Sequence, residues 1–387
     1  MRRTTTARWC AAACLALVGC TPGPGPDGPT TPVTDGSPTA VATTPVPRPS
    51  APTASAAPPA VLVRADGTVV DGPVLDLGAA RRVRLGTDVT HVRDVPAEPG
   101  TRSSVEDLRP DGSFLVRTVD AAPSGDGGGT LGALREVTAD GVRTLHPPAD
   151  DDVADRLVAG DARRVDAGIA WVEPYGAGDE NRLVLVPHGS SRARVVVPRS
   201  AGDDRVTALA RWGAVLADGR VVGWDSAVTG TPAPPGTDLR HTPAGDDVVE
   251  TRCDLTGCEL ALLTEGGRRE VVLRGPAGTW AVVSDGRHLV VRVEDGATTW
   301  GVDMLGGTAV RIVGELFPSS MSDGRAVVED GRGVVVVDLV DRAVERLGTG
   351  EVVTVAIAAD LVALGALGHE GAGADGDGGD VLRWPRR

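Results

Sequence analysis

Lysine is absent from the chain, and phenylalanine, tyrosine and tryptophan together make up only 3% of its 387 residues. All 39 basic residues are therefore arginines, against 53 acidic residues, which gives a formal net charge of −14. An acidic protein repels phosphate backbones, and the sequence has no basic run long enough to bind nucleic acid. We therefore expect no nucleic-acid partner.

Motifs for catalysis or cofactor binding are equally scarce. No G-x-S-x-G turn and no H-E-x-x-H pair occurs, and the histidines stand singly. Gly371–Gly376 fits G-x-G-x-x-G, but no following helix completes it as a dinucleotide site requires. Asp150–Asp152 and the carboxylates of Asp375, Asp377 and Asp380 indicate solvated loops, because no further ligands follow at the spacing of a calcium loop. The sequence thus predicts no catalytic residue, no cofactor and no metal site. The six histidines are His91, His146, His188, His241, His288 and His369.

Residues 1–19 have the features of a secretion signal peptide. Three arginines form a basic segment, and the apolar stretch Trp9–Val18 follows them. About ten helical residues rise only ~15 Å, which is too short to span a bilayer. The stretch ends in Leu17-Val18-Gly19-Cys20, which resembles the lipobox of bacterial lipoproteins.

The lipobox resemblance implies cleavage before Cys20 and a diacylglycerol on its sulfur. Two acyl chains suffice for stable anchoring, so we expect the protein at the extracytoplasmic face of the cell membrane. The alternative is an ordinary secreted protein in which a cysteine occupies this position by chance.

Residues 20–60 comprise the lipidated cysteine and a linker. Between Thr21 and Ala60, 12 of the 40 residues are proline and 11 are serine or threonine. Such a segment cannot offset the entropy of ordering, so it predicts a disordered, polyproline-like tether that reaches up to ~120 Å. Serine and threonine beside proline suit O-mannosylation, and a bare spacer is the alternative.

From Val61 onward, short valine-rich runs alternate with turn residues. β-branched runs of this length predict strands, and no amphipathic helical stripe accompanies them. Asp-Gly pairs separate many of the runs and supply the positive φ angles that tight hairpins need. The sequence therefore predicts an all-β domain over residues 61–387. The Asp-Gly pairs begin at Asp66, Asp111, Asp140, Asp218, Asp285, Asp323 and Asp330.

A longer period of about 40 residues is superimposed on the strands, in units that each hold three or four strands. Such units are typical of β-propeller blades. We expect seven blades, with six or eight as alternatives and two β-sandwich domains as the competing fold. Residues 61–85 are expected to close the last blade against the C-terminal segment. The expected units are 101–150, 153–199, 203–243, 244–275, 279–313, 317–347 and 352–385.

Two short motifs carry a family resemblance. Val337-Asp338-Leu339 and Trp224-Asp225 resemble strand endings of propeller repeats, and the domain resembles the TolB-like and WD40-like propellers of actinobacterial lipoproteins. The resemblance implies a module that binds a protein or a cell-wall glycan rather than an enzyme. A cell-wall or glycan-directed hydrolase or lyase at the channel mouth is the alternative. We expect a monomer whose only membrane contact is its lipid anchor.

Cys253 and Cys258 are the cysteines that remain beyond Cys20. They flank a short turn between two predicted strands, where facing positions bring their Cβ atoms together. We predict a disulfide between them, as expected outside the cytoplasm. The tryptophans on or beside predicted strands are expected to fill gaps between blades, with an exposed sugar platform as the alternative. They are Trp171, Trp212, Trp224, Trp280 and Trp300.

Overall fold

The described part of the chain is built from strands. It has no α-helix, and its only helical elements are the single-turn 3-10 helices η1 (Leu77–Ala79), η2 (Gly202–Asp204) and η3 (Glu265–Gly267). No helix among these residues could cross a membrane. The predicted signal peptide, Cys20 and the tether lie outside the described residues. The computed structural model describes residues 61–96, 101–120, 131–148, 161–176, 179–293, 298–314, 316–329, 333–348, 352–366 and 379–386.

The described strands form six hydrogen-bonded sheets, none of which closes on itself. Three sheets are antiparallel meanders of four strands that follow one another along the chain. The first contains β5 (Thr101–Leu108), β6 (Phe114–Asp120), β7 (Leu131–Thr138) and β8 (Gly141–Leu145). The second contains β9 (Ala162–Val165), β10 (Gly168–Tyr175), β11 (Glu180–Pro187) and β12 (Arg194–Ala201). The third contains β13 (Val206–Leu209), β14 (Gly213–Leu216), β15 (Val221–Gly223) and β16 (Val228–Thr229).

The ten-stranded sheet combines two further meanders, joined by a single parallel pair between Ala244 and Ser284. One meander contains β17 (Asp238–Ala244), β18 (Asp247–Asp254), β19 (Gly257–Thr264) and β20 (Arg268–Gly275). The other contains β21 (Trp280–Ser284), β22 (His288–Val293), β23 (Thr298–Asp303) and β24 (Ala309–Val313). The last two sheets contain β25 (Phe317–Ser322), β26 (Arg325–Glu329), β27 (Val334–Asp338) and β28 (Ala343–Leu347), and β29 (Val352–Ala358), β30 (Leu361–Ala366) and β31 (Gly379–Arg383).

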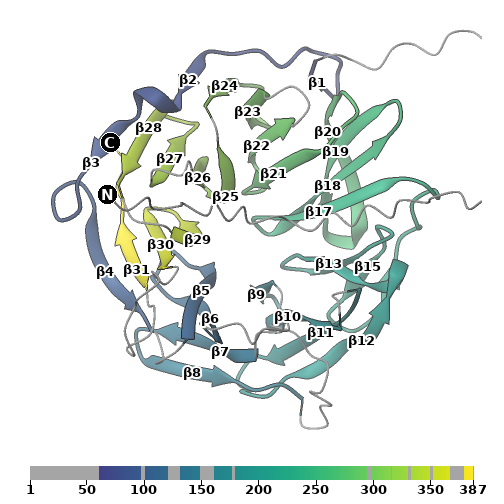
Figure 1. Cartoon of the computed structure of the whole chain (residues 1–387). Helices are drawn as coiled ribbons and strands as arrows, with labels where there is room; N and C mark the ends of the chain where they lie inside the picture. Colours follow the sequence, from purple (N-terminus) through teal and green to yellow (C-terminus); the bar gives the residue numbers. More distant parts are fainter. Residues whose placement is uncertain are drawn as a thin grey trace, which may run out of the picture. The chain divides into compact units, whose positions relative to one another are not determined.

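An N-terminal segment runs along the outside of four successive meanders (Figure 1). Its strands are β1 (Val63–Arg64), β2 (Val74–Asp76), β3 (Arg81–Val83) and β4 (Thr90–Val95). They pair with β20, β24, β28 and β31, respectively. We call residues 63–95 the belt, and the four meanders that it borders the covered meanders. The meanders β5–β8, β9–β12 and β13–β16 are the uncovered meanders.

The meanders follow one another in a circle, with the first strand of each on the inside (Figure 1). Strand β5 contacts β9, β10 contacts β13, and β13 contacts β17. The contacts continue from β17 to β21, β25 and β29, and β29 returns to β5. The fold is therefore propeller-like.

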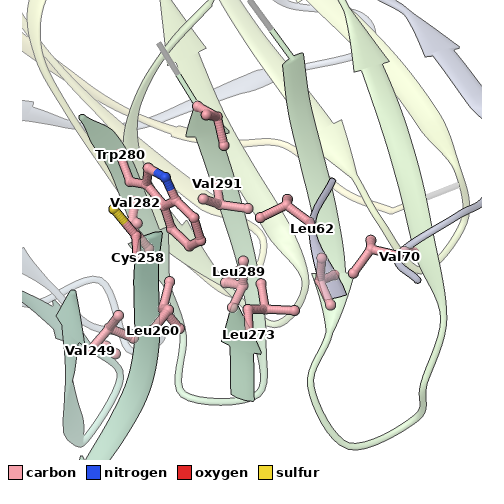
Figure 2. Packing of buried hydrophobic residues seen from close by; sticks show 14 residues of the cluster. Leu62, Val70, Val249, Cys258, Leu260, Leu273, Trp280, Val282, Leu289 and Val291 are labelled. Atoms are coloured by element: carbon pink, nitrogen blue, oxygen red, sulfur yellow. The ribbon is translucent and has the colours of Figure 1, made fainter. Parts of the chain in front are cut away.

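Apolar side chains fill the spaces between neighbouring meanders. In Figure 2, Leu260 and Leu273 lie beside Leu289 of the next meander, and all three are fully buried. Leu62, which directly precedes the belt, packs onto the same cluster from outside. Each meander thus covers an apolar face that its neighbour would otherwise expose.

The tryptophans largely occupy the predicted places. Trp171 and Trp280 are each 3% exposed and pack in clusters that join two neighbouring meanders. The prediction that they fill gaps is confirmed for these two. Trp212, Trp224 and Trp300 are partly buried against adjoining clusters.

The Asp-Gly prediction is confirmed wherever the structure describes the pair. The glycines after Asp66, Asp111, Asp140, Asp218, Asp285 and Asp323 all have positive φ. At the β21–β22 turn, Gly286 has a φ of 90°, and Asp285 Oδ1 accepts hydrogen bonds from the N–H groups of Arg287 and His288 at 2.9 and 2.6 Å. The pair at Asp330 lies outside the described residues.

Two boundary predictions are wrong. Residues 238–243 were expected to end the unit 203–243, but they belong to β17, which pairs with β18 from Asp238 opposite Cys253 to Ala244 opposite Asp247. Residues 61–85 were expected to close the last blade, but β4 closes it instead. The reason is that β1, β2 and β3 pair with β20, β24 and β28 of three earlier meanders, so the chain reaches β31 only at β4.

Candidate functional site

A cavity of about 990 Å³ lies among the inner strands. Every meander contributes to its wall, although β13–β16 does so only through Arg211 in the β13–β14 turn. The β21–β22, β25–β26 and β27–β28 turns also line it. The cavity therefore occupies the centre of the circle, toward the end that carries these turns. Its lining includes Leu108, Ala162, Arg211, Thr242, Val283, Met321 and Ile357.

Arginine side chains brace the wall of the cavity. Arg163 on β9 donates from Nη1 to the carbonyl oxygen of Leu209 at 2.9 Å and from Nη2 to that of Gly245. Burial lowers the pKa of Arg163, although a guanidinium stays charged. The N–H of Arg164 donates to Asp107 Oδ2 at 2.9 Å. These bonds tie different meanders together around the cavity.

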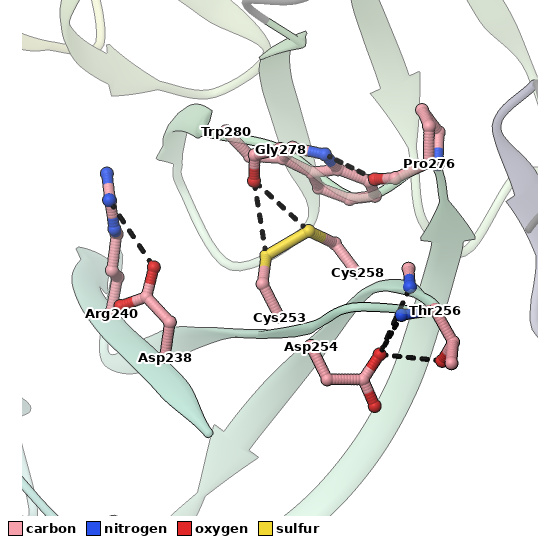
Figure 3. Close-up of a disulfide and its surroundings, with 10 residues drawn as sticks. Asp238, Arg240, Cys253, Asp254, Thr256, Cys258, Pro276, Gly278 and Trp280 are labelled. Atoms are coloured by element: carbon pink, nitrogen blue, oxygen red, sulfur yellow. Dashed lines mark hydrogen bonds and ion pairs between the residues drawn. A yellow bond between two sulfur atoms is a disulfide. The ribbon is translucent and has the colours of Figure 1, made fainter. Parts of the chain in front are cut away.

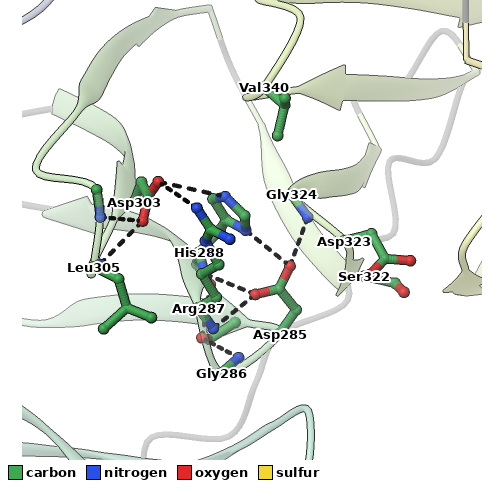
Figure 4. Close-up of polar contacts among 12 residues, drawn as sticks. Asp285, Gly286, Arg287, His288, Asp303, Leu305, Ser322, Asp323, Gly324 and Val340 are labelled. Atoms are coloured by element: carbon green, nitrogen blue, oxygen red, sulfur yellow. Dashed lines mark hydrogen bonds and ion pairs between the residues drawn. The ribbon is translucent and has the colours of Figure 1, made fainter.

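His288 lies between two carboxylates at one side of the cavity (Figure 4). Its Nδ1 is 3.3 Å from Asp285 Oδ2, and its Nε2 is 3.9 Å from Asp303 Oδ2. Asp285 Oδ2 also accepts from the N–H of Gly324 at 2.6 Å, which joins the β21–β22 and β25–β26 turns. Burial opposes ionisation of Asp303, but main-chain N–H groups of its own turn and the nearby Arg287 lower its pKa.

Serine hydroxyls in the lining serve the fold. Ser284 Oγ donates to the carbonyl oxygen of His288 at 2.7 Å. Ser320 and Ser322 accept from main-chain N–H groups in and just after β29, at 3.3 and 3.1 Å. None of these three hydroxyls contacts the His288 imidazole, whose nitrogens face carboxylates. Ser320 and Ser322 therefore link two meanders, and none of the three serines forms a serine–histidine nucleophile.

Three charged residues of the lining are exposed and unpaired, unlike the arginines described above. Among the described lining residues, Asp161, Asp323 and Arg342 are exposed, and their side chains make no hydrogen bond or ion pair. Asp323 and Arg342 have φ angles of 50° and 54°, and their turns are joined by a bond from the N–H of Leu339 to Gly324 O at 2.8 Å. The cavity thus presents free groups of both charge signs.

Glu106 is the lining carboxyl with the most unusual environment. Burial raises its pKa, and the negative charge of Asp161 adds to the rise, whereas Arg117 and Ser104 oppose it. Arg117 Nη2 lies 2.6 Å from Glu106 Oε1.

The predicted disulfide is present and lies away from the cavity. Cys253 and Cys258 face each other across β18 and β19 with a Cα–Cα distance of 4.1 Å, as predicted (Figure 3). The carbonyl oxygen of Gly278 lies 3.5 and 3.3 Å from the two sulfur atoms. Leu255 at the tip of this hairpin is 98% exposed. The bridge fixes a hairpin and takes no part in the cavity wall.

Sequence reasoning missed the cavity residues as a set. Asp285 and Asp323 were noticed only as repeated turn residues. Nothing in their spacing showed that turns more than 100 residues apart would meet. Asp375 and Asp377 lie outside the described residues.

The arrangement defines a propeller-like all-β protein with a central, charged cavity. Among solved structures, the chain is similar to the acylaminoacyl peptidase of Pyrococcus horikoshii, with 12% identity and a TM-score of 0.46 over 70% of this chain and 50% of that chain. A structure from a study of two prolyl endopeptidases shows 14% identity and a TM-score of 0.47, over 69% and 45%. Hsv2 of Kluyveromyces lactis shows 12% identity and a TM-score of 0.43, over 68% and 89%.

The chain thus spans about half the length of the first peptidases that it matches. At these identities and TM-scores the likeness assigns no activity to it. No family model matches the chain, and no curated protein matches it.

Proposed function

We propose that this chain is a lipid-anchored extracytoplasmic protein whose seven-bladed β-propeller binds a ligand in its central cavity. Cys20 carries the lipid, residues 1–19 are the cleaved signal peptide, and residues 20–60 form the tether. The binding domain is a monomer and acts without chemistry. The observation that supports this proposal is the cavity, which all seven meanders line and which carries unpaired charges of both signs.

The seven successive meanders support the proposal of seven blades. The ten-stranded sheet counts as two blades, because only the pair Ala244–Ser284 joins its halves. The last blade combines β29, β30 and β31 with β4 from the other end of the domain. A ring closed in this way has no free ends, which suits a rigid binding platform.

The unpaired groups favour a polypeptide ligand over a neutral glycan. Asp161 and Asp323 attract cations, Arg342 attracts carboxylates, and a peptide segment supplies both. Because the braced wall is already formed, a ligand meets little ordering cost. The partner is thus expected to insert a segment that bears both charge signs.

The binding proposal is tested with the full chain on native envelope extracts. The triple variant Asp161→Ala/Asp323→Ala/Arg342→Ala should lose a crosslinked protein that the wild type captures. The control Arg268→Ala, with an exposed arginine outside the cavity lining, should keep it. Equal capture by all three proteins would contradict the cavity as the site, and binding of purified cell-wall glycan alone would replace the polypeptide ligand with a glycan.

Anchoring is tested independently. Cys20→Ser should release the protein into the medium and abolish incorporation of a palmitate analogue. Cys10→Ser, a change within the predicted signal peptide, should leave both unchanged. A Cys20→Ser protein that stays in the membrane fraction would contradict the lipid anchor.

One observation favours the enzymatic alternative, a cell-wall or glycan-directed hydrolase or lyase. Glu106 has a raised pKa and a carboxylate neighbour, Asp161, which is the pairing of acid and base that glycan cleavage uses. Incubation with cell-wall glycan should then release new ends with wild type and with Glu270→Gln but not with Glu106→Gln. No release by the wild type would leave binding as the function.

A further inference from the structure

The seam between the two ends of the domain brings together three metal-ligating side chains. Strand β4, near the start of the domain, pairs with β31, near its end. His91 and Asp94 lie on β4, and Asp380 lies on β31. One ligand atom from each of the three lies within 4.8 Å of the others.

The register of β4 and β31 brings two carboxylates together, which is unfavourable without a bound cation. Asp94 stands directly opposite Asp380, and like charges at facing positions of neighbouring strands destabilise the pair. His91 Nε2 lies 2.9 Å from Asp94 Oδ1 and 3.4 Å from Asp380 Oδ1. The His91 imidazole and the carboxylates of Asp94 and Asp380 therefore lie close together where β4 pairs with β31.

We propose that His91, Asp94 and Asp380 form a binding site for a divalent transition-metal ion, with Zn²⁺ as the reference ion, that ties the two ends of the ring together. One imidazole with two carboxylates is a donor set for Zn²⁺ or Mn²⁺, whereas Ca²⁺ and Mg²⁺ prefer oxygen ligands alone. The side chains are 44%, 87% and 52% exposed, so water completes the coordination. Such an open site binds with modest affinity.

The site would act on stability through ring closure. A metal that binds the folded seam and not the unfolded chain stabilises the folded state by mass action. Because its ligands come from positions almost 290 residues apart, binding should oppose the opening of the whole ring. Acid should weaken binding, because the imidazole must be deprotonated to bind metal.

The test is thermal unfolding of the full chain, without a histidine tag, in excess EDTA and then with Zn²⁺, Mn²⁺ or Ca²⁺. Zn²⁺ should raise the Tm by about 3 °C or more. His91→Gln and Asp380→Asn should lose this rise. The matched controls His146→Gln and Asp140→Asn, at exposed positions elsewhere, should keep it. No rise in the wild type, or an equal rise in the ligand variants, would overturn the proposal.

Two further readouts separate a site from general effects on folding. In EDTA, Asp380→Asn should melt no lower than the wild type, because it relieves the repulsion from Asp94. Co²⁺ should give the wild type a visible absorption band that His91→Gln lacks. A Co²⁺ band that persists in His91→Gln, or a Ca²⁺ effect equal to that of Zn²⁺, would also overturn the proposal.

Discussion

The covered and uncovered meanders differ in what holds their outer edges. Each covered meander gains a strand of the belt, and side chains secure it, as where Arg346 Nη2 donates to Leu77 O at 3.0 Å. The uncovered meanders end in β8, β12 and β16, without an outer partner among the described residues. Strand β12 carries Arg194, Pro198 and Arg199, which discourage further pairing. Main-chain pairing with the belt therefore covers the outer edges of four meanders, and the outer edges of the other three lack it.

The junction between the halves shows how side chains replace the belt. Thr207 of the uncovered meander β13–β16 bonds His241 Nδ1 of β17 at 2.8 Å. His241 Nε2 lies 3.5 Å from Glu250 Oε2, and Glu250 also binds Arg252 and Arg269 at 3.1 and 2.7 Å. Glu250 and His241 side chains are 1% and 0% exposed. The contact between Thr207 and His241 thus connects the uncovered half to a network of ion pairs centred on buried Glu250 in the covered half.

Removal of the belt should have the largest effect. A chain without residues 61–95 loses every outer strand of the covered meanders, including β4, and leaves the ring open. We expect the Tm to fall by more than about 10 °C and the transition to broaden. Calorimetry provides the measurement, and a chain without residues 61–83, which retains β4, should lose less. A sharp transition at the original Tm in the larger deletion would show that the belt does not close the ring.

Loss of the buried Glu250 carboxylate at the junction should have the second largest effect on stability. Glu250→Gln leaves Arg252 and Arg269 without their common carboxylate, and we expect a loss of about 3 kcal/mol in the free energy of unfolding. Urea unfolding at neutral pH measures it. Glu270→Gln, whose carboxylate is exposed, is the control and should change little. An equal effect of both variants would contradict a stabilising role for the network around Glu250.

Acid should weaken the same junction. Burial opposes ionisation of Glu250, yet His241 and the two arginines lower its pKa from 4.5 to about 2. The folded pKa is below the unfolded one, so this contribution is complete above about pH 4.5 and is lost as the pH falls toward 2. Urea titrations between pH 6 and about pH 3 should show a steeper loss for wild type than for Glu250→Gln. Parallel curves would contradict the assignment.

Opening the disulfide should have a moderate effect confined to a covered meander. Cys253→Ser/Cys258→Ser removes a cross-link that closes a short loop, worth about 2 kcal/mol. Denaturant unfolding should show this loss with no change in the capture of a cavity ligand. If ligand capture falls with stability intact, the hairpin tip at Leu255 belongs to the binding surface.

A change on an uncovered edge should have the smallest effect. Val195 on β12 is 37% exposed, and we expect Val195→Lys to alter the free energy of unfolding by less than about 0.5 kcal/mol. Chemical denaturation suffices to measure it. A loss of several kcal/mol would mean that this edge is covered in solution.

The sequence predicted what local chemistry determines. Valine runs and Asp-Gly turns identified the strands and hairpins, and the spacing of Cys253 and Cys258 identified the disulfide. The belt escaped prediction because its strands are short and their partners are remote, as with Val63 opposite Arg274. The cavity escaped it because single turn residues become neighbours only when the ring closes. His91 and Asp380 likewise stand too far apart for spacing to connect them.

Amide hydrogen exchange along β4 tests ring closure most directly. If β4 completes the last meander, the amides of Thr90–Val95 that pair with β31 should exchange as slowly as those of β6, through opening of the whole domain. Exchange of β4 as fast as that of the two-residue edge strand β16, with β31 and β6 still protected, would contradict a ring closed by the N-terminal belt.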